Sequence, residues 1–337
     1  MYDLIRPLLF NLPAETAHNL TLSLLKLPGA EGLAASVPSD IINQEVIIDG
    51  LKFRNPLGLA AGLDKNAEVF NQMAKLGFGF VEVGTVTPKP QPGNEQPRLF
   101  RLKKDKALIN RMGFNNMGVK TMKEKLQHNK ANIPIGGNIG KNKITPNEEA
   151  LNDYIYCFEE LYDLVDYFTI NISSPNTPGL RELQNKEFLA ALFGRLNDMN
   201  MARKPIFFKV APDMSFEQLD ELLDVALLFN LSGIIATNTT LDRSGLKSSD
   251  SELEKIGAGG LSGAPLKKNS TEIVKHIYKS SSGKLPIIAC GGIMNGDNEK
   301  EKLDAGASLI QIYTGFVYKG PALIAEILRK TKQRHVN

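Results

Sequence analysis

The sequence predicts an α/β protein built as a (β/α)8 barrel, the TIM barrel, with a two-helix extension at its N-terminus. From residue 55 onward, short apolar runs alternate with longer segments of helical periodicity. Eight such units occupy about 260 residues, which is the usual size of this barrel. A doubly wound open sheet would show the same alternation and stays open as an alternative. Its Gly-x-Gly-x-x-Gly fingerprint is missing after the first apolar run.

Eight apolar runs are the predicted barrel strands. Several are nearly continuous, as expected of parallel strands that are buried on both faces. Between two of them, residues 216–229 place leucines at helical spacing. An Asp49-Gly50 pair between the short apolar runs 46–48 and 51–53 predicts a hairpin, which we expect to close the floor of the barrel. The predicted strands are residues 55–62, 80–87, 133–140, 167–174, 205–212, 233–240, 285–293 and 309–315.

Residues 1–45 lie outside this alternation and are predicted as a helical extension, with the barrel domain at 46–337. Two helical patterns, 3–10 and 13–27, each carry one apolar face, and Pro13 stands at a helix start. Two interpretations stay open: the pair packs on the barrel, or its apolar faces touch a membrane. The few charges of this segment balance one another and do not decide between the two.

Composition argues against several classes of function. A net charge of +3 over 337 residues, without a basic stripe, argues against nucleic acid as a partner. Cys157 and Cys290 stand far apart and lack metal-ligand spacing, so we expect no metal site and a reducing compartment. No apolar run approaches the roughly 18 residues of a membrane-spanning helix. The N-terminus also lacks the pattern of a secretory signal.

Polar side chains gather where the predicted strands end, and in parallel α/β folds these carboxyl ends bind ligands. The run 167–172 gives way to a turn rich in serine, proline and asparagine that contains Ser174. Asparagine is depleted in strands, yet Asn138, Asn171 and Asn238 stand in them. Any one of these would be explained as a turn residue or a satisfied core amide. Together at one barrel mouth they favour a ligand with a planar pattern of donors and acceptors.

Two further features concern a charged cofactor. Lys209 stands inside an apolar run, where it needs an anion, a lowered pKa or a route to water for its tip. Its possible uses include a Schiff-base nucleophile and neutralisation of a negatively charged flavin. Gly291-Gly292 and Thr314-Gly315 occur at the seventh and eighth strands, where barrels build phosphate sites from backbone N–H groups. The positions of these pairs therefore favour a phosphorylated cofactor.

Five motifs, in order and on the expected strands, carry a family resemblance. With them the chain resembles the class 2, quinone-dependent dihydroorotate dehydrogenases over essentially its whole length. Class 1 relatives place a cysteine at the position of Ser174 and lack the helical extension, so both marks here are those of class 2. The motifs are Ala-Ala-Gly-Leu-Asp-Lys at 60–65, Asn-Arg-Met-Gly-Phe-Asn at 110–115, Asn-Ile-Ser-Ser-Pro-Asn-Thr at 171–177, Ala-Thr-Asn-Thr-Thr at 236–240 and Gly-Leu-Ser-Gly at 260–263.

The resemblance implies an enzyme that oxidises (S)-dihydroorotate to orotate in de novo pyrimidine (UMP) biosynthesis. It implies one FMN per chain as hydride acceptor, a membrane quinone as final electron acceptor, and Ser174 as catalytic base. The implied substrate contacts are Lys65, Asn110, Arg111, Met112, Gly113, Phe114, Asn171, Asn176, Asn238 and Thr239. The implied FMN contacts are Ala61, Gly62, Leu63, Asp64, Lys65, Thr85, Asn138, Asn171, Lys209, Thr237, Gly263, Gly292, Tyr313 and Thr314. The implied quinone-site residues are His18, Arg101 and Tyr313.

The resemblance also implies a peripheral protein at the cytoplasmic face of the cell membrane, with the extension 1–45 covering a quinone tunnel. It leaves the oligomeric state open, a monomer included. Two rival functions stay open as well. One is a Schiff-base lyase that uses Lys209, and the other is an FMN-binding membrane scaffold without activity. The presence of both Ser174 and Lys65 argues against the scaffold.

Overall fold

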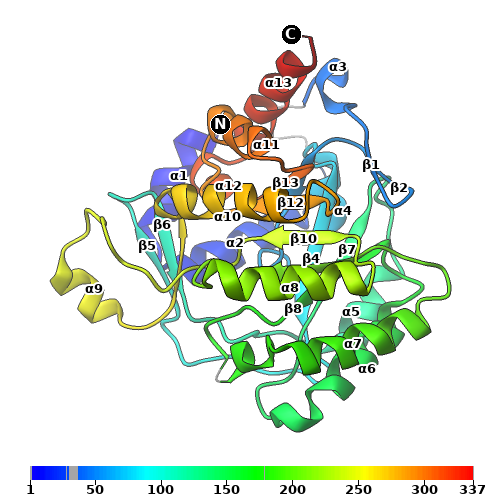
Figure 1. The fold of residues 1–337 in the computed structure, drawn as a ribbon. Coiled ribbons are helices and arrows are strands. Elements are labelled where there is room, and N and C mark those ends of the chain that lie inside the picture. Colours follow the sequence, from blue (N-terminus) through cyan, green and yellow to red (C-terminus); the bar gives the residue numbers. More distant parts are fainter. Residues whose placement is uncertain (1, 28, 30–36, 178, 337) are drawn as a thin grey trace.

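The fold is a closed barrel of eight parallel strands, seen in a computed structural model that describes residues 2–27, 29, 37–177 and 179–336 (Figure 1). The barrel strands pair in chain order, and the last pairs with the first through the partners Ile310 and Leu57. Closure confirms the (β/α)8 barrel and excludes the open doubly wound sheet. The strands are β3 (Leu57–Leu59), β4 (Phe80–Val86), β7 (Ile135–Ile139), β8 (Tyr167–Asn171), β9 (Ile206–Val210), β10 (Gly233–Ala236), β12 (Ile287–Cys290) and β13 (Leu309–Ile312).

All eight predicted strands are present, and each ends earlier than predicted at its carboxyl side. The predicted strand 167–174, for example, stops at Asn171. The end of the strand was predicted too late because the chain stays apolar beyond it, and Ile172 is fully buried in the main core. The segments beyond the strand ends are therefore buried loops, and these loops carry the predicted ligand residues.

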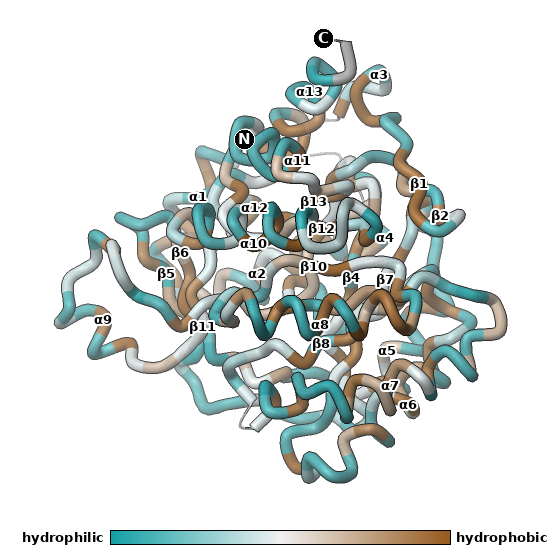
Figure 2. Tube along the Cα trace, in the orientation of Figure 1, coloured by the Kyte–Doolittle hydropathy of each residue, from teal (hydrophilic) through white to brown (hydrophobic). Residues whose placement is uncertain are grey.

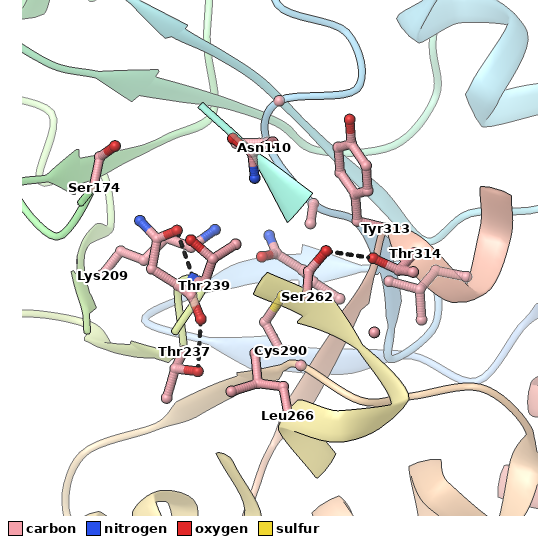
Figure 3. Close-up of a pocket in the computed structure, with 18 of the residues that line it drawn as sticks. Asn110, Ser174, Lys209, Thr237, Thr239, Ser262, Leu266, Cys290, Tyr313 and Thr314 are labelled. Atoms are coloured by element: carbon pink, nitrogen blue, oxygen red, sulfur yellow. Dashed lines mark hydrogen bonds between the residues drawn. The ribbon is translucent and has the colours of Figure 1, made fainter. Parts of the chain in front are cut away.

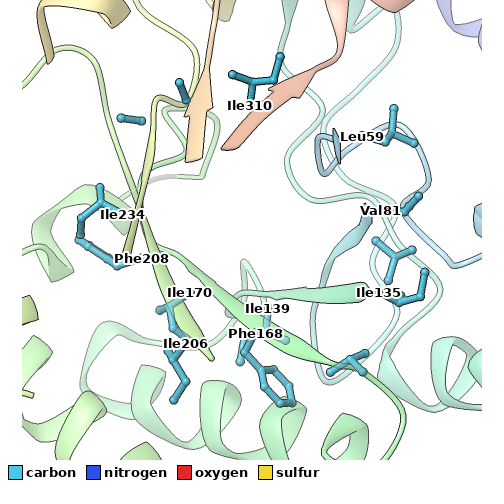
Figure 4. Packing of buried hydrophobic residues seen from close by; sticks show 14 of the residues in the cluster. Leu59, Val81, Ile135, Ile139, Phe168, Ile170, Ile206, Phe208, Ile234 and Ile310 are labelled. Atoms are coloured by element: carbon cyan, nitrogen blue, oxygen red, sulfur yellow. The ribbon is translucent and has the colours of Figure 1, made fainter. Parts of the chain in front are cut away.

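Side chains of the barrel strands alternate between an outer and an inner layer. Phe168 and Ile170 of β8 point outward into the core between barrel and helices (Figure 4). Tyr167 points inward and packs with Phe80 and Phe207 in an aromatic cluster at the amino ends of the strands. This cluster fills the lower barrel and leaves the carboxyl ends for polar groups.

The predicted hairpin closes the floor of the barrel. It consists of β1 (Val46–Ile48) and β2 (Leu51–Phe53), with the predicted residues paired. Asp49 and Gly50 have φ values of 47° and 79°, the left-handed geometry that a tight hairpin turn requires. Ile48 and Phe53 belong to the same cluster as the inward aromatic residues of the strands. Their burial there confirms the expected position of the hairpin.

Helices cover the outside of the barrel. The predicted helix 216–229 is α8 (Phe216–Leu228), which begins at a capping box formed by Ser215 and Gln218. Apolar and polar residues alternate along its tube in Figure 2, as its buried and exposed faces require. A short third helix, α3 (Ser39–Ile42), lies inside the predicted extension. The other helices are α4 (Phe70–Lys75), α5 (Val119–Leu126), α6 (Ala150–Leu161), α7 (Lys186–Met199), α9 (Asp250–Ile256), α10 (Lys267–Ser280), α11 (Gly296–Asp304), α12 (Thr314–Lys319) and α13 (Ala322–Val336), with short 3-10 turns at Asn147–Glu149, Leu180–Leu183 and Ala264–Leu266.

The N-terminal extension forms the two predicted helices, α1 (Tyr2–Asn11) and α2 (Ala14–Leu25). One side of the pair packs on the barrel domain, where Arg6 donates to the carbonyl of Tyr318 at 2.9 Å. The other side is apolar and open: Leu4 is 80% exposed and Leu8 is 68% exposed. The first interpretation, packing, is thus confirmed for one side only. Residues 1, 28 and 30–36 of the predicted extension lie outside the described part of the chain.

A small antiparallel sheet was missed and replaces part of the predicted long loop after the second barrel strand. It contains β5 (Leu99–Leu102), β6 (Ala107–Asn110) and β11 (Gly260–Gly263), with β6 in the middle. Each strand has only four residues, too few for the alternation of a strand to stand out. The sheet joins two motifs that lie 150 residues apart, because Asn110 pairs with Gly260.

Candidate active site

A cavity opens at the carboxyl ends of the barrel strands, beside the small sheet (Figure 3). It encloses about 1060 Å³, counting its open mouth. The predicted residues that line it are Ala61, Gly62, Lys65, Thr85, Asn110, Met112, Gly113, Phe114, Asn171, Ser174, Asn176, Lys209, Thr237, Asn238, Thr239, Gly263, Gly292, Tyr313 and Thr314. The fold therefore brings most of the predicted substrate and cofactor residues to one place.

Four predicted contact residues do not line the cavity: Leu63, Asp64, Arg111 and Asn138. Asp64 is fully buried, and its carboxylate accepts the backbone N–H groups of Glu68 and Val69 at 2.7 and 2.8 Å. Arg111 donates to the carbonyl of Ala258 at 2.8 Å, outside the cavity. The side chains of Asp64 and Arg111 thus hold loops in place instead of facing a ligand.

Asparagine amides form one wall of the cavity and fix one another. Asn176 Nδ2 donates to Asn110 Oδ1 at 3.1 Å. Asn238 Nδ2 donates to Ser173 Oγ at 3.0 Å, and that hydroxyl lies 3.2 Å from Asn171 Oδ1. Since each amide is held by a neighbour, its remaining donors and acceptors have set directions. Such a wall suits a flat ring with several polar edges.

Glu82 organises a buried polar layer beneath this wall. Its Oε1 accepts from Asn138 at 2.7 Å, and its Oε2 accepts from Gln311 at 2.8 Å and Thr169 at 3.1 Å. Asn138 therefore supports the site from below. Gln311 lines the cavity, and its buried Oε1 has no partner within the described residues. The available signal for Glu82 was a charge on the inward face of a strand, two residues after Phe80.

Ser174 lies just beyond β8, lines the cavity and is almost fully buried. Its Oγ accepts the backbone N–H of Asn176 at 3.2 Å, so its side chain is held at the start of the turn. Within the described residues, no basic side chain is hydrogen-bonded to this hydroxyl. A serine in this setting takes part in proton transfer only when a ligand or solvent also removes its own proton.

Two lysines bring positive charge to the cavity. Lys209 comes from β9 and is almost fully buried. Lys65 comes from the loop after β3, and its burial lowers its pKa to about 8, against the opposing effect of the Glu15 carboxylate. Both side chains belong to the cavity lining. The site is therefore suited to a ligand that carries negative charge.

The opposite end of the cavity is built from closely packed backbone. Gly292 has a φ of 75°, and a Cβ added there would lie 2.2 Å from the Cα of Lys267. Gly263 has a φ of 99° and also faces this end. The hydroxyls of Ser262 and Thr314 lie 2.8 Å apart (Figure 3). Thr314 begins α12, and the first N–H groups of a helix lack intrahelical partners. Such a turn suits an anion.

The three predicted quinone-site residues do not form one cluster of contacts. Tyr313 lines the cavity, and burial raises its pKa to about 12. His18 of α2 has its pKa lowered to about 3, first by burial and then by the positive charge of Lys65. Arg101 instead donates to the carbonyl of Leu9 at 3.1 Å and fastens α1 to the small sheet. Of the three, only Tyr313 lines the cavity. His18 lies close enough to Lys65 for its pKa to respond to that charge, and Arg101 lies at the contact of α1 with the small sheet.

Several lining residues were given no role from the sequence. Gln311 and Cys290 stand at the ends of apolar strands, where composition alone marks them as core. Ser262 lies within one of the five motifs, but only the structure shows that it lines the cavity and contacts Thr314. The lining residues without a predicted role are Ala60, Ser262, Leu266, Cys290, Ile293, Met294, Gln311 and Ile312, whereas Gly291 and Gly315 line the cavity as parts of the predicted phosphate-site pairs.

Comparisons with known proteins point to one family. The family model described as dihydroorotate dehydrogenase matches residues 43–334. A dihydroorotate dehydrogenase (quinone) of Christiangramia forsetii is 52% identical, with 98% of each chain covered. One of Gloeobacter violaceus is 49% identical, covering 99% of this chain and 94% of that one. The crystal structure of the Eimeria tenella enzyme with ferulenol superposes with a TM-score of 0.87 at 38% identity, over 96% and 92% of the two chains.

Proposed function

The chain belongs to the dihydroorotate dehydrogenase family, and from that membership we propose that the cavity at the barrel mouth is its active site, built around FMN. The chain is a quinone-dependent enzyme of pyrimidine biosynthesis. It oxidises dihydroorotate to orotate and passes the electrons to a quinone. The family uses a flavin, and its identity as FMN, one per chain, is part of our proposal. Membership also removes the lyase alternative for Lys209.

The residues at both ends of the cavity fit FMN. At one end, Gly292 and Gly263 leave room for close backbone approach, and Thr314 offers the start of a helix to a phosphate. At the other end, the partnerless acceptor of Gln311 would receive an N–H of the flavin ring. Lys209 would balance negative charge on that ring. When bound, FMN would supply a hydride acceptor able to pass the two electrons from dihydroorotate on to the quinone.

The amide wall would hold the substrate ring, and Ser174 would take its proton. Dihydroorotate carries alternating carbonyl and N–H groups, which match the directed donors and acceptors of Asn110, Asn176 and Asn238. The Ser174 hydroxyl would accept the proton next to a ring carbonyl as the hydride leaves the neighbouring carbon. The ammonium of Lys65 would stabilise the substrate carboxylate or the negative charge that develops on the carbonyl.

The N-terminal extension would connect this site to a membrane. The exposed leucines of α1 and α2 form an apolar surface that a bilayer interface would bury. In the part of the chain that the structure describes, no helix is long and apolar enough to cross a membrane. We therefore propose peripheral attachment at the cytoplasmic face, with residues 1–45 as the quinone-side unit and 46–337 as the catalytic barrel. His18 and Tyr313 would lie on the path between the two.

The observation that carries this proposal is that one cavity is lined by Ser174, by the amides of Asn110, Asn176 and Asn238, and by the backbone of Gly291 and Gly292. The test is anaerobic mixing of the purified protein with dihydroorotate while the flavin absorbance is followed. We expect the flavin to bleach and a quinone to restore its colour. A flavin that stays oxidised would leave only the inactive scaffold. Heating the protein releases the bound flavin, and mass spectrometry then identifies it. Riboflavin or FAD in place of FMN would contradict the proposal.

A further inference from the structure

Lys302 of α11 is a buried cation that the proposed chemistry does not use. Its side chain is fully buried. Its Nζ donates to the carbonyl of Lys267 at 3.1 Å, to Ser270 Oγ at 2.5 Å and to Thr271 Oγ1 at 2.7 Å. None of these acceptors is charged, and among the described residues no carboxylate forms an ion pair with this ammonium. A fully buried lysine without an anionic partner is rare, because burial of an unpaired charge is costly.

The three acceptors lie within residues 267–271 at the start of α10, called here its first turn, which lies directly behind Gly291 and Gly292 of the cavity. Ser270 Oγ is 3.0 Å from the carbonyl oxygen of Gly291. A Cβ added at Gly292 would lie 2.2 Å from the Cα of Lys267, so the two backbones are in close contact. The first turn of α10 therefore forms a layer between the ammonium of Lys302 and the glycines that face the ligand.

We propose that Lys302 is a positioning residue for the phosphate end of the cavity: it fixes the first turn of α10 behind Gly291 and Gly292 and supplies a positive charge to the phosphate across that turn. The inference rests on the proposed function, since it requires a phosphorylated flavin. Lys302 touches neither the phosphate nor the reacting atoms. The phosphate dianion would add a counter-charge to an ammonium that, among the described residues, interacts with carboxylates only at a distance.

The electrostatics of Lys302 agree with this role. Burial lowers its pKa to about 7, the effects of Cys290, Glu301 and Glu272 oppose that shift, and Lys267 adds to it. A nearby anion favours the protonated form of a lysine. A bound phosphate would therefore stabilise the charged state that burial disfavours. A lysine that serves only to hold α11 against α10 would have no such dependence on the ligand.

The test compares FMN with riboflavin, which has the same ring system and no phosphate. Purified holoprotein is dialysed against graded concentrations of either flavin, and bound flavin is measured by absorbance. Lys302→Met should raise the Kd for FMN about tenfold or more, as expected when a buried charged donor is lost. The Kd for riboflavin should stay within about threefold, because the ring wall is untouched. An equal change for both flavins, or none, would overturn the proposal.

A matched control comes from the same helix. Lys300 is exposed and forms a surface ion pair with Asp304, so Lys300→Met should leave both Kd values unchanged. If Lys302→Met does not fold, Ser270→Ala is used to test the proposal in its place. This substitution removes the hydroxyl that lies between Lys302 and Gly291. Ser270→Ala should weaken FMN more than riboflavin, and equal effects would again reject the role. A wild-type protein without preference for FMN would instead refute FMN as the cofactor.

Discussion

The carboxylate of Glu15, in α2, forms an ion pair with the guanidinium of Arg98. Arg98 Nη2 and Nε both donate to Glu15 Oε1, at 2.7 and 3.1 Å. Arg98 also donates to the carbonyl of Asn94 at 2.9 Å, and Asn94 Nδ2 donates to the carbonyl of Asn176 at 3.2 Å. A chain of contacts thus leads from the N-terminal extension to the amide wall of the site. The ion pair between Glu15 and Arg98 is shielded from water, because the side chain of Arg98 is only 9% exposed and that of Glu15 only 15%.

Glu15→Gln should loosen the extension from the barrel, because it leaves the buried guanidinium of Arg98 without a counter-charge. We expect a loss of roughly 1–3 kcal/mol in the free energy of unfolding. Limited proteolysis should also cut residues 2–27 faster. Asp3→Asn is the control, since Asp3 is 76% exposed in its pair with Arg6 and should matter little. Equal protease resistance of the Glu15 variant and the wild type would refute a fastening role.

The exposed leucines of α1 offer a test of membrane attachment that leaves the packed side intact. The double variant Leu4→Asp, Leu8→Asp should abolish flotation with lipid vesicles, since burial of each leucine contributes about 1.5–3 kcal/mol. Turnover with a long-tailed quinone should fall more than turnover with a small soluble acceptor. Met201→Asp is the control, because Met201 is 86% exposed on the α7 to β9 loop. An unchanged ratio of the two turnover rates would mean that the helices only pack.

Ser174→Ala should keep the flavin but slow its reduction by dihydroorotate roughly 10²–10⁴-fold, the usual effect of losing a general base. Ser174→Cys should recover part of the rate at high pH, because a thiol ionises more readily than a hydroxyl. Stopped-flow absorbance under anaerobic conditions measures both. Ser251→Ala is the control, since Ser251 is exposed on α9 and does not line the cavity. A wild-type rate in Ser174→Ala would remove Ser174 as the base.

Gly292→Ala should cost more stability than Gly245→Ala, although both positions have a left-handed backbone, with φ of 75° and 71°. The Cβ at 245 meets open space, so only backbone strain of about 1–2 kcal/mol is expected there. The Cβ at 292 would collide with Lys267, which should add about 1–3 kcal/mol and lower the FMN content. Urea unfolding and flavin absorbance measure the two effects. Equal losses in the two variants would contradict the close approach at Gly292.

The stability of the wild type should fall in mild acid because of His18. Its pKa is lowered in the folded protein to about 3, against 6.5 in the unfolded chain, so the unfolded chain binds the proton first. The stabilising contribution is present above pH 6.5 and is lost as the pH falls toward 3. Relative to His18→Asn, the wild type should lose up to about 2 kcal/mol between pH 6.5 and 4.5. The exposed His128→Asn serves as control, and parallel urea titrations of wild type and His18→Asn would contradict the prediction.

The barrel could be predicted because strand length, periodicity and turn chemistry are local properties of the chain. The hairpin at Asp49-Gly50 was predicted to the residue, since only a few conformations suit that pair. The carboxyl ends of the strands were placed too late, because burial keeps the following loops apolar, as at Ile172. The small sheet was missed because its strands have only four residues each and because one of its two pairings joins distant residues, such as Asn110 with Gly260.

The sequence by itself determined the order of the eight units, the two N-terminal helices and the gathering of Ser174 and the amides at one end of the barrel. Only the tertiary structure decided where each side chain points. Asp64 and Arg111 belong to motifs of the site and yet bond to backbone away from the cavity, whereas Gln311 faces the cavity from an apolar strand. Side-chain direction depends on partners far away in the chain, as with Glu15 and Arg98, 83 residues apart, and periodicity carries no information about such partners.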